Sequence, residues 1–299
     1  MKILNSIIYL FLLFSVVFAS CKSGNKSKKE QREESYIIND FKQDKLYPAE
    51  EQELQFKSNG SVIYGFEYAV NGKGPHPTVI LLHGLPGNER NLDVAQNLRR
   101  AGYNVVYFNY RGSWGSKGTF GFNNAIEDTK AVIDYICDPA HALSMRVDTN
   151  RIALVGHSMG AGIALISGLQ DKRVKAVTGI SVFNPYTLLK GKDAPGNLLS
   201  LKEYLLTLGM LNCDPNQFLN DILKNIDQYN IEELAANTSK PVLVIDEHKN
   251  NNYLARYTKN NKKLQYKMWD TDHAFTNRRI ALSKEIKTWL DKSLKQKTK

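Results

Sequence analysis

Four short runs rich in Val, Ile and Leu constrain the fold of this chain more than any other feature. They are Thr78–Leu82, Asn104–Tyr110, Arg151–Val155 and Val174–Ser181. Continuous apolar runs of this length are typical of strands buried on both faces of a parallel sheet, because helices cover both sides of such a sheet. The intervals between the runs are long enough for crossover helices. The pattern therefore predicts an α/β fold built on a doubly wound, mostly parallel sheet.

Further strands and helices are predicted around these four runs. A hairpin turning at Ser58-Asn59-Gly60 precedes them, and two more strands follow them, so that eight strands are expected in all. The additional strands are Glu53–Lys57, Ser61–Val70, Pro241–Ile245 and Lys263–Trp269. The helices are predicted at Asn88–Arg100, Asn123–Ile136, Met159–Leu169 and about Asn277–Lys295.

The alternation of strands and helices lapses between Phe183 and Lys240. Leu198–Leu211 and Phe218–Ile226 have helical patterns interrupted by breaker residues. We expect a small helical cap insertion at about residues 184–239 within a domain that spans residues 46–299.

The first residues have the features of an export signal. An apolar run, Ile3–Phe18, precedes Ala19-Ser20-Cys21, and this arrangement resembles the lipobox of bacterial lipoproteins. The resemblance implies that residues 1–20 are a signal peptide and that Cys21 carries acyl chains, palmitate among them, which insert into the lipid bilayer. An uncleaved signal anchor is the alternative. Residues 21–45 are predicted to be a flexible tether, and the cell envelope is the expected location.

The formal net charge of +10 favours either an anionic partner or a lysine-rich soluble surface. Nucleic-acid grooves interleave basic residues with stacking aromatic residues, and no stretch of this sequence does so. We therefore expect no nucleic-acid partner. Arg111 is expected to form a structural ion pair with Asp128.

Beyond Cys21, two cysteines remain, Cys137 and Cys213. The sequence contains neither a CxxC pair nor a Cys/His spacing typical of metal ligands, so no metal or cofactor is predicted. A disulfide between them is possible in an exported protein, but Cys137 follows an apolar helical stretch, which favours a buried free thiol.

The motif Gly156-His157-Ser158-Met159-Gly160 is the strongest chemical signal. It lies directly after one predicted strand and directly before a predicted helix, as a nucleophile elbow requires. In this arrangement Ser158 stands on a strained turn, and the flanking glycines allow the strand and helix to approach closely. The motif predicts Ser158 as a nucleophile, with the amide of Met159 as one donor to an oxyanion.

With three other segments, this motif resembles the α/β-hydrolase superfamily. The segments are Pro77–Arg90 with His83-Gly84, Tyr110–Ser116, and Asp272-His273 before the last helix. The chain is most similar to prolyl-oligopeptidase-like and esterase-like exported hydrolases, from about Glu53 to Leu290. The resemblance implies an α/β-hydrolase fold and makes the amide of Leu85 the second oxyanion donor.

The resemblance also implies the order nucleophile, acid, histidine along the chain. His248 and His273 follow Ser158, and His273 lies where the superfamily places its general base. The acid is expected after the strand Pro241–Ile245. Asp246 is preferred there because it is nearer the sheet edge, with Glu247 as the alternative, and the usual aspartate of the superfamily is shifted or absent.

These residues predict a serine hydrolase that cleaves an ester, thioester or amide bond of a small substrate through an acyl-enzyme. Alternatives are a short-peptide peptidase, a cofactor-free haloperoxidase or perhydrolase, and a catalytically silent binding lipoprotein. Aromatic and leucine residues of the cap either favour an apolar acyl or small aromatic group or only pack the cap onto the sheet. They are Tyr186, Leu198, Leu199, Tyr204 and Leu205.

Overall fold

The computed structural model describes residues 35–295, and the chain divides into two parts, residues 1–38 and 39–299. Of the first part, the structure describes the short helix α2 (Ser35–Ile38). Cys21 and the predicted signal peptide lie outside the described residues. Within residues 35–295, no helix has both the length and the apolar character needed to cross a bilayer.

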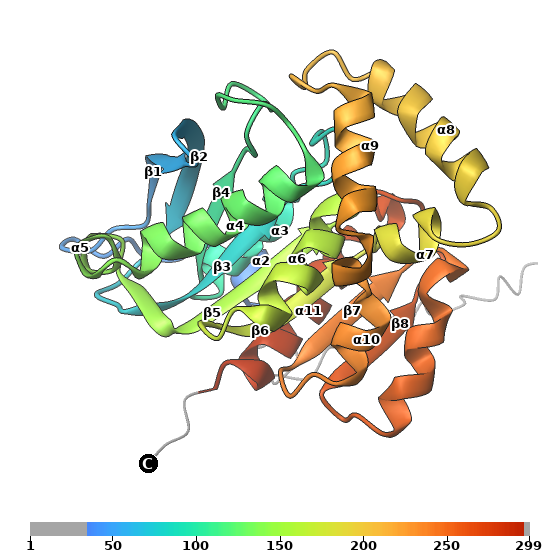
Figure 1. The fold of residues 1–299 in the computed structure, drawn as a ribbon. Helices are drawn as coiled ribbons and strands as arrows, with labels where there is room; N and C mark the ends of the chain where they lie inside the picture. The colour runs from blue at the N-terminus through green and yellow to red at the C-terminus, as the bar shows by residue number, and fades with distance from the viewer. Residues whose placement is uncertain (1–34, 296–299) are drawn as a thin grey trace, which may run out of the picture. The chain divides into compact units, whose positions relative to one another are not determined.

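The second part is built on one eight-stranded sheet (Figure 1). The strands are β1 (Glu50–Ser58), β2 (Ser61–Ala69), β3 (His76–Leu82), β4 (Asn104–Phe108), β5 (Val147–His157), β6 (Val174–Ile180), β7 (Val242–Asp246) and β8 (Leu264–Met268). Their order across the sheet is β1-β2-β4-β3-β5-β6-β7-β8. The β1–β2 and β2–β4 pairs are antiparallel, and all other pairs are parallel. The prediction of a mostly parallel eight-stranded sheet is confirmed.

Helices connect the strands and cover both faces of the sheet (Figure 1). They are α3 (Leu92–Arg100), α4 (Phe122–Cys137), α5 (Pro139–Ser144), α6 (Met159–Gln170), α7 (Pro185–Leu189), α8 (Ala194–Leu206), α9 (Pro215–Lys224), α10 (Ile231–Ala236) and α11 (Arg279–Ser293), with 3-10 helices η2 (Ile226–Tyr229), η3 (Lys249–Lys259) and η4 (Thr276–Arg278). Helices α3 and α11 pack on one face, and α4 and α6 pack on the other.

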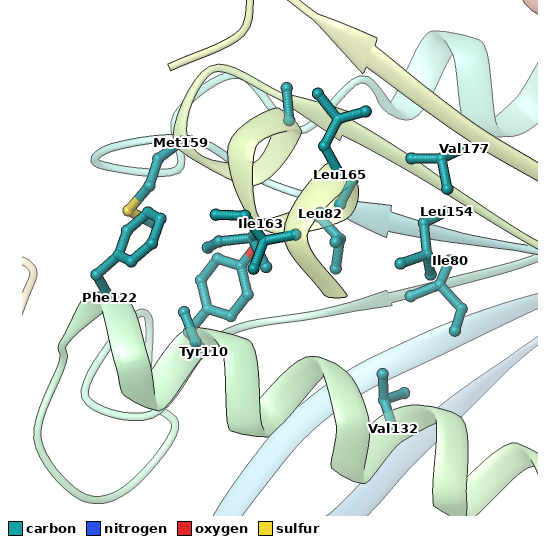
Figure 2. Packing of buried hydrophobic residues seen from close by; sticks show 14 of the residues in the cluster. Ile80, Leu82, Tyr110, Phe122, Val132, Leu154, Met159, Ile163, Leu165 and Val177 are labelled. Atoms are coloured by element: carbon teal, nitrogen blue, oxygen red, sulfur yellow. The ribbon is translucent and has the colours of Figure 1, made fainter. Parts of the chain in front are cut away.

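The alternation of side chains along each strand produces two separate cores. In β3, Ile80 and Leu82 face α4 and α6, whereas Val79 and Leu81 face α3 and α11, as the two-residue period of a strand requires. Figure 2 shows the first of these cores, where side chains from β3 and β5 lie close to those of α6. Burial of both faces explains why the central strands read as continuous apolar runs.

Other local predictions can be compared with the structure directly. The hairpin at Asn59-Gly60 is confirmed, with β1 and β2 paired on either side of it. The ion pair of Arg111 with Asp128 is confirmed as well, with Nε 2.6 Å from Oδ1. The segment between β6 and β7 contains α7, α8, α9, η2 and α10, in the stretch for which a helical insertion was expected.

Candidate active site

Ser158 stands at the junction of β5 and α6. Its backbone has φ 56° and ψ −119°, a conformation that is strained for any residue with a side chain. The turn is held on both sides, because the Ser158 N–H donates to the Ile180 carbonyl at 2.8 Å and the Ser158 carbonyl accepts from the Phe183 N–H at 3.1 Å. This is the geometry of a nucleophile elbow.

The glycines of the motif are required by close backbone packing. A Cβ atom on Gly156 would lie 2.1 Å from the carbonyl oxygen of Gly160, and one on Gly160 would lie 2.1 Å from that of Leu82. The helix therefore touches both its own strand and β3. Met159 is buried, and Figure 2 shows its side chain pointing toward Phe122, so the residue after the nucleophile is anchored in the core.

The loop after β3 lies against the nucleophile. A Cβ atom on Gly84 would come within 2.7 Å of the Ser158 Cβ. His83 is buried and donates from Nδ1 to the Gly84 carbonyl at 2.8 Å; burial lowers the pKa of this histidine to about 4, so the ring is neutral at neutral pH. Because C=O and N–H point opposite ways across a trans peptide, this bond directs the Leu85 N–H away from His83.

The amides of Leu85 and Met159 are available as donors. The N–H of Leu85 makes no hydrogen bond to another residue within 35–295. Met159 is the first residue of α6, and the first amides of a helix have no partner inside it. Trp114 supports the loop by donating from Nε1 to the Pro86 carbonyl at 2.7 Å.

His273 lies in the loop between β8 and η4, and its side chain is 58% exposed. Its carbonyl accepts a hydrogen bond from Nε2 of His157 at 2.8 Å, so the residue beside the nucleophile fixes the backbone of this loop. Burial lowers the pKa of His157 to about 4, and this ring is also neutral at neutral pH.

The carboxylate beside His273 is that of Glu247. Its Oε1 is 2.9 Å from Nδ1 of the imidazole. Burial acts to raise the pKa of the Glu247 carboxyl, but hydrogen bonds from His273 and Ser181 outweigh it and hold the pKa below its ordinary value. Glu247 is therefore charged at neutral pH.

Asp246, the preferred acid in the sequence analysis, points to the other face of the sheet. Its carboxylate is fully buried and accepts from the Val182 N–H at 2.8 Å and from Nδ2 of Asn251 at 3.1 Å. Consecutive residues at the end of a strand face opposite sides, so only one of the two carboxylates can meet the imidazole. The structure reverses the order of preference, because it pairs Glu247 with His273.

Ser181, which the sequence analysis did not single out, joins this pair. It follows β6, and its Oγ lies 2.8 Å from Oε1 of Glu247 and 2.8 Å from Nδ1 of His273. Its position directly after the strand beside β5 is the one signal that could have identified it, since the carboxyl ends of neighbouring parallel strands meet at one edge.

A cavity of about 610 Å³ opens at this edge and is lined by both Ser158 and His273. No hydrogen bond joins these two side chains in the described part of the chain. The remaining lining is rich in amide and hydroxyl groups: Ser181, Val182, Phe183, Asn184, Thr187, Leu188, Asp193, Asn197, His248, Asn250 and Asn251. His248, the other candidate base, shares the cavity, but the Glu247 carboxylate is bonded to His273.

The sequence is similar to known proteins over part of its length. Residues 67–194 match the model of the BD-FAE family. The chain is 29% identical over 177 residues to the quorum-quenching protein AidA of Acinetobacter baumannii, a match that covers 52% of this chain and 57% of AidA. The chain thus spans little more than half the length of that relative.

Solved esterase structures share the fold. A Pyrococcus furiosus esterase superposes with a TM-score of 0.59 at 19% identity, covering 87% of this chain and 96% of the esterase. Est1E of Butyrivibrio proteoclasticus, solved with ferulic acid bound, superposes with a TM-score of 0.58 at 17% identity, covering 80% of this chain and 98% of Est1E. The chain therefore has the α/β-hydrolase fold.

The aromatic and leucine residues of the predicted cap do not line the described cavity. Of these five residues, Leu205 is buried, whereas Leu199 and Tyr204 are exposed. Tyr204 donates from its hydroxyl to the Leu85 carbonyl at 3.4 Å, so α8 contacts the loop after β3. Of the two interpretations of these residues, their positions favour packing of the cap, because Leu205 is buried and Leu198 packs against the same core.

The cysteines of the described part are Cys137 and Cys213, and both are free and half-buried. Burial raises the pKa of each thiol. Within residues 35–295, no group of three or more His, Cys, Asp or Glu side chains is arranged to hold a metal ion.

Proposed function

We propose that this protein is a carboxylic ester hydrolase in which Ser158 is the nucleophile, His273 the general base and Glu247 the acid. One observation carries the proposal. A carboxylate bonded to Nδ1 of His273 orients a ring that opens onto the same cavity as a serine held in a strained turn. Such a carboxylate favours the tautomer in which Nε2 is free to accept the proton of the serine.

In the first half of the reaction, Oγ of Ser158 forms a bond with the ester carbonyl carbon while its proton passes to Nε2 of His273. Rotation of the exposed imidazole brings Nε2 within hydrogen-bond reach, because such contacts are often long before substrate binds. The carbonyl electron pair moves onto oxygen, where the Leu85 and Met159 amides stabilise it. The proton on Nε2 then passes to the leaving alcohol oxygen as its bond to carbon breaks.

In the second half, water attacks the acyl-enzyme and His273 accepts a proton from that water. The second tetrahedral oxyanion collapses, and the proton returns to Oγ of Ser158 as the acid leaves. Glu247 stays charged throughout and stabilises the imidazolium that forms in each half.

The cavity supports an ester of small size with polar groups. Its volume of about 610 Å³ is in the range of small-molecule sites, and its asparagine side chains offer both donors and acceptors. Esters of hydroxylated aromatic acids fit this chemistry, and Est1E, which shares the fold, has been solved with ferulic acid bound. Ferulate esters are therefore the first natural substrates to test.

Hydrolysis of p-nitrophenyl esters of graded chain length tests the activity. The protein beginning at residue 22 should hydrolyse the acetate and butyrate, and Ser158→Ala should lower kcat by about 10⁴-fold or more. A fluorophosphonate probe should label the wild-type protein and leave Ser158→Ala unlabelled. Equal rates for both forms would remove Ser158 from the mechanism. A wild type that neither hydrolyses nor labels would favour the alternative of a silent binding protein.

We propose separately that acyl chains on Cys21 anchor the protein in the cell envelope. The support is the lipobox-like sequence Ala19-Ser20-Cys21 alone. Cells fed an alkyne analogue of palmitate should incorporate it into the wild-type protein and not into Cys21→Ala, and the wild type should sediment with membranes. Release of both proteins into the soluble fraction would contradict the anchor.

A further inference from the structure

Ser181 contacts both members of the pair formed by Glu247 and His273, and the two contacts are equal in length. Its Oγ, Oε1 of Glu247 and Nδ1 of His273 form a nearly equilateral triangle with sides of 2.8, 2.8 and 2.9 Å. The residue is 1% exposed. A hydroxyl at this position meets both members of the pair at once.

The backbone at Ser181 is held in an uncommon conformation. Its φ is 51°, a left-handed value that residues with side chains rarely adopt, and its N–H donates to the Ile245 carbonyl at 2.8 Å. This bond ties the end of β6 to β7, only two residues before Glu247. The strain therefore places the hydroxyl where the loops after β6, β7 and β8 meet.

The count of protons at the triangle limits how the hydroxyl can act. The Glu247 carboxylate is charged and can only accept, so the Ser181 proton is drawn to Oε1. Once this proton is directed at Glu247, Oγ can only accept from Nδ1. Both neighbours of Nδ1 are then acceptors, and both favour the tautomer with hydrogen on Nδ1 and a free lone pair on Nε2.

We propose that Ser181 is a positioning residue that, together with Glu247, sets the tautomer and ring orientation of His273. This inference rests on the proposed function of the site. Ser181 makes no bond to the reacting atoms in the mechanism above. Its effect should appear in the chemical step and not in substrate binding.

The test compares Ser181→Ala and Ser181→Gly with the wild type in p-nitrophenyl acetate hydrolysis. Both variants remove the hydroxyl, and glycine also relieves the left-handed backbone, so a folding defect of the alanine form would not be shared. A hydrogen bond to a charged group is strong enough that its loss should lower kcat about tenfold, with KM within about twofold. Ser283→Ala, which removes from α11 a buried hydroxyl that accepts a hydrogen bond from Asn97 of α3, should leave kcat unchanged.

A double-mutant cycle tests whether the effect of the Ser181 hydroxyl on the reaction rate depends on Glu247. In a Glu247→Ala background, Ser181→Gly should change the rate of Ser158 labelling by a fluorophosphonate less than about twofold. The charged acceptor that directs the hydroxyl proton away from Nδ1 is then gone, so the hydroxyl no longer enforces one tautomer of His273. An undiminished tenfold effect in that background would overturn the inference, as would a kcat within twofold of wild type in both single variants. A change in KM alone would instead assign Ser181 to substrate contact, which also overturns it.

These outcomes separate the two proposals. An inactive wild type, or a Ser158→Ala form with wild-type activity, removes the hydrolase function itself. If the wild type is active, Ser158→Ala is inactive and the Ser181 variants keep wild-type activity, only the role of Ser181 is removed.

Discussion

The candidate site has two sides, which are held together by different forces. The nucleophile side carries Ser158, and the base side carries His273. On the nucleophile side, β3, β5 and α6 approach so closely that only glycine fits at positions 156 and 160. On the base side, the loops after β6, β7 and β8 meet through hydrogen bonds among Ser181, Glu247 and His273. Packing fixes the first side, and polar contacts fix the second.

The difference between the sides determines how each should fail. Close backbone packing cannot yield without moving a strand or a helix, so damage there should appear as lost stability. The hydrogen bonds among Ser181, Glu247 and His273 contribute less to global stability than backbone packing does, but they set the protonation and angle of one ring. Damage on the base side should therefore appear as lost catalysis in a folded protein.

The largest expected effect separates the two adjacent carboxylates. Glu247→Gln replaces an acceptor beside Nδ1 with an amide that can donate to it, which favours the wrong tautomer. We expect kcat to fall by roughly 10³- to 10⁴-fold with little change in the unfolding midpoint. Hydrolysis of p-nitrophenyl acetate and thermal unfolding measure the two quantities.

Asp246→Asn is the matched control for that variant. It alters a buried carboxylate that holds the Val182 N–H and Asn251 but does not bond to His273. We expect lower stability and a kcat within about tenfold of wild type, because a buried network is weakened and the ring is untouched. A larger kcat loss for Asp246→Asn than for Glu247→Gln would restore Asp246 as the acid.

On the nucleophile side, adding a side chain to the close-packed backbone should lower the stability of the fold. A Cβ atom on Gly160 would lie 2.1 Å from the Leu82 carbonyl oxygen and 2.5 Å from that of His83, and these backbone atoms cannot move aside alone. Gly160→Ala should lower the free energy of unfolding by about 3 kcal/mol or more, as measured by urea denaturation.

Gly196→Ala provides the control for this substitution. Gly196 lies in α8, where an added Cβ atom would point into open space, so alanine there should be neutral or stabilising by up to about 1 kcal/mol. If the two variants had the same free energy of unfolding within error, the backbone around Gly160 would be able to shift and accommodate the added Cβ atom.

The same contrast explains what could be predicted from the sequence. The strand runs and the elbow are encoded locally, because apolar periodicity and glycine spacing lie within a few residues of one another. The sheet and the position of Ser158 in it were therefore predictable. The contacts of the base side join residues 181, 247 and 273, which are far apart in the sequence, so no local sequence pattern predicts them.

The choice of acid shows where this limit lies. Alternation along β7 requires Asp246 and Glu247 to face opposite sides, but it does not say which side the loop of His273 occupies. Ser181 was missed because a serine at a strand end is common. The role of the cap leucines stayed open because helical spacing does not reveal that Asn184 and Asn197, not Leu198 or Leu199, line the cavity.

The smallest expected effect is a difference in how the two sides respond to acid. Two buried histidines, His83 and His157, support the nucleophile side, and burial lowers the pKa of each to about 4. An unfolded histidine binds its proton near pH 6.5. At these two sites the unfolded chain binds more protons than the folded chain between about pH 6.5 and 4, so their contribution to stability falls as the pH falls through this range.

Each histidine can contribute up to about 3 kcal/mol to that loss. The base side should not contribute in the same range, because hydrogen bonds keep the pKa of Glu247 below its ordinary value despite the opposing effect of burial. His157→Gln retains an amide N–H that can reach the His273 carbonyl but cannot gain a proton. Thermal unfolding from pH 7 to pH 4 should show a shallower loss of stability for this variant than for the wild type. Parallel curves would mean that His157 is protonated in the folded protein, and that acid does not distinguish the two sides through this residue.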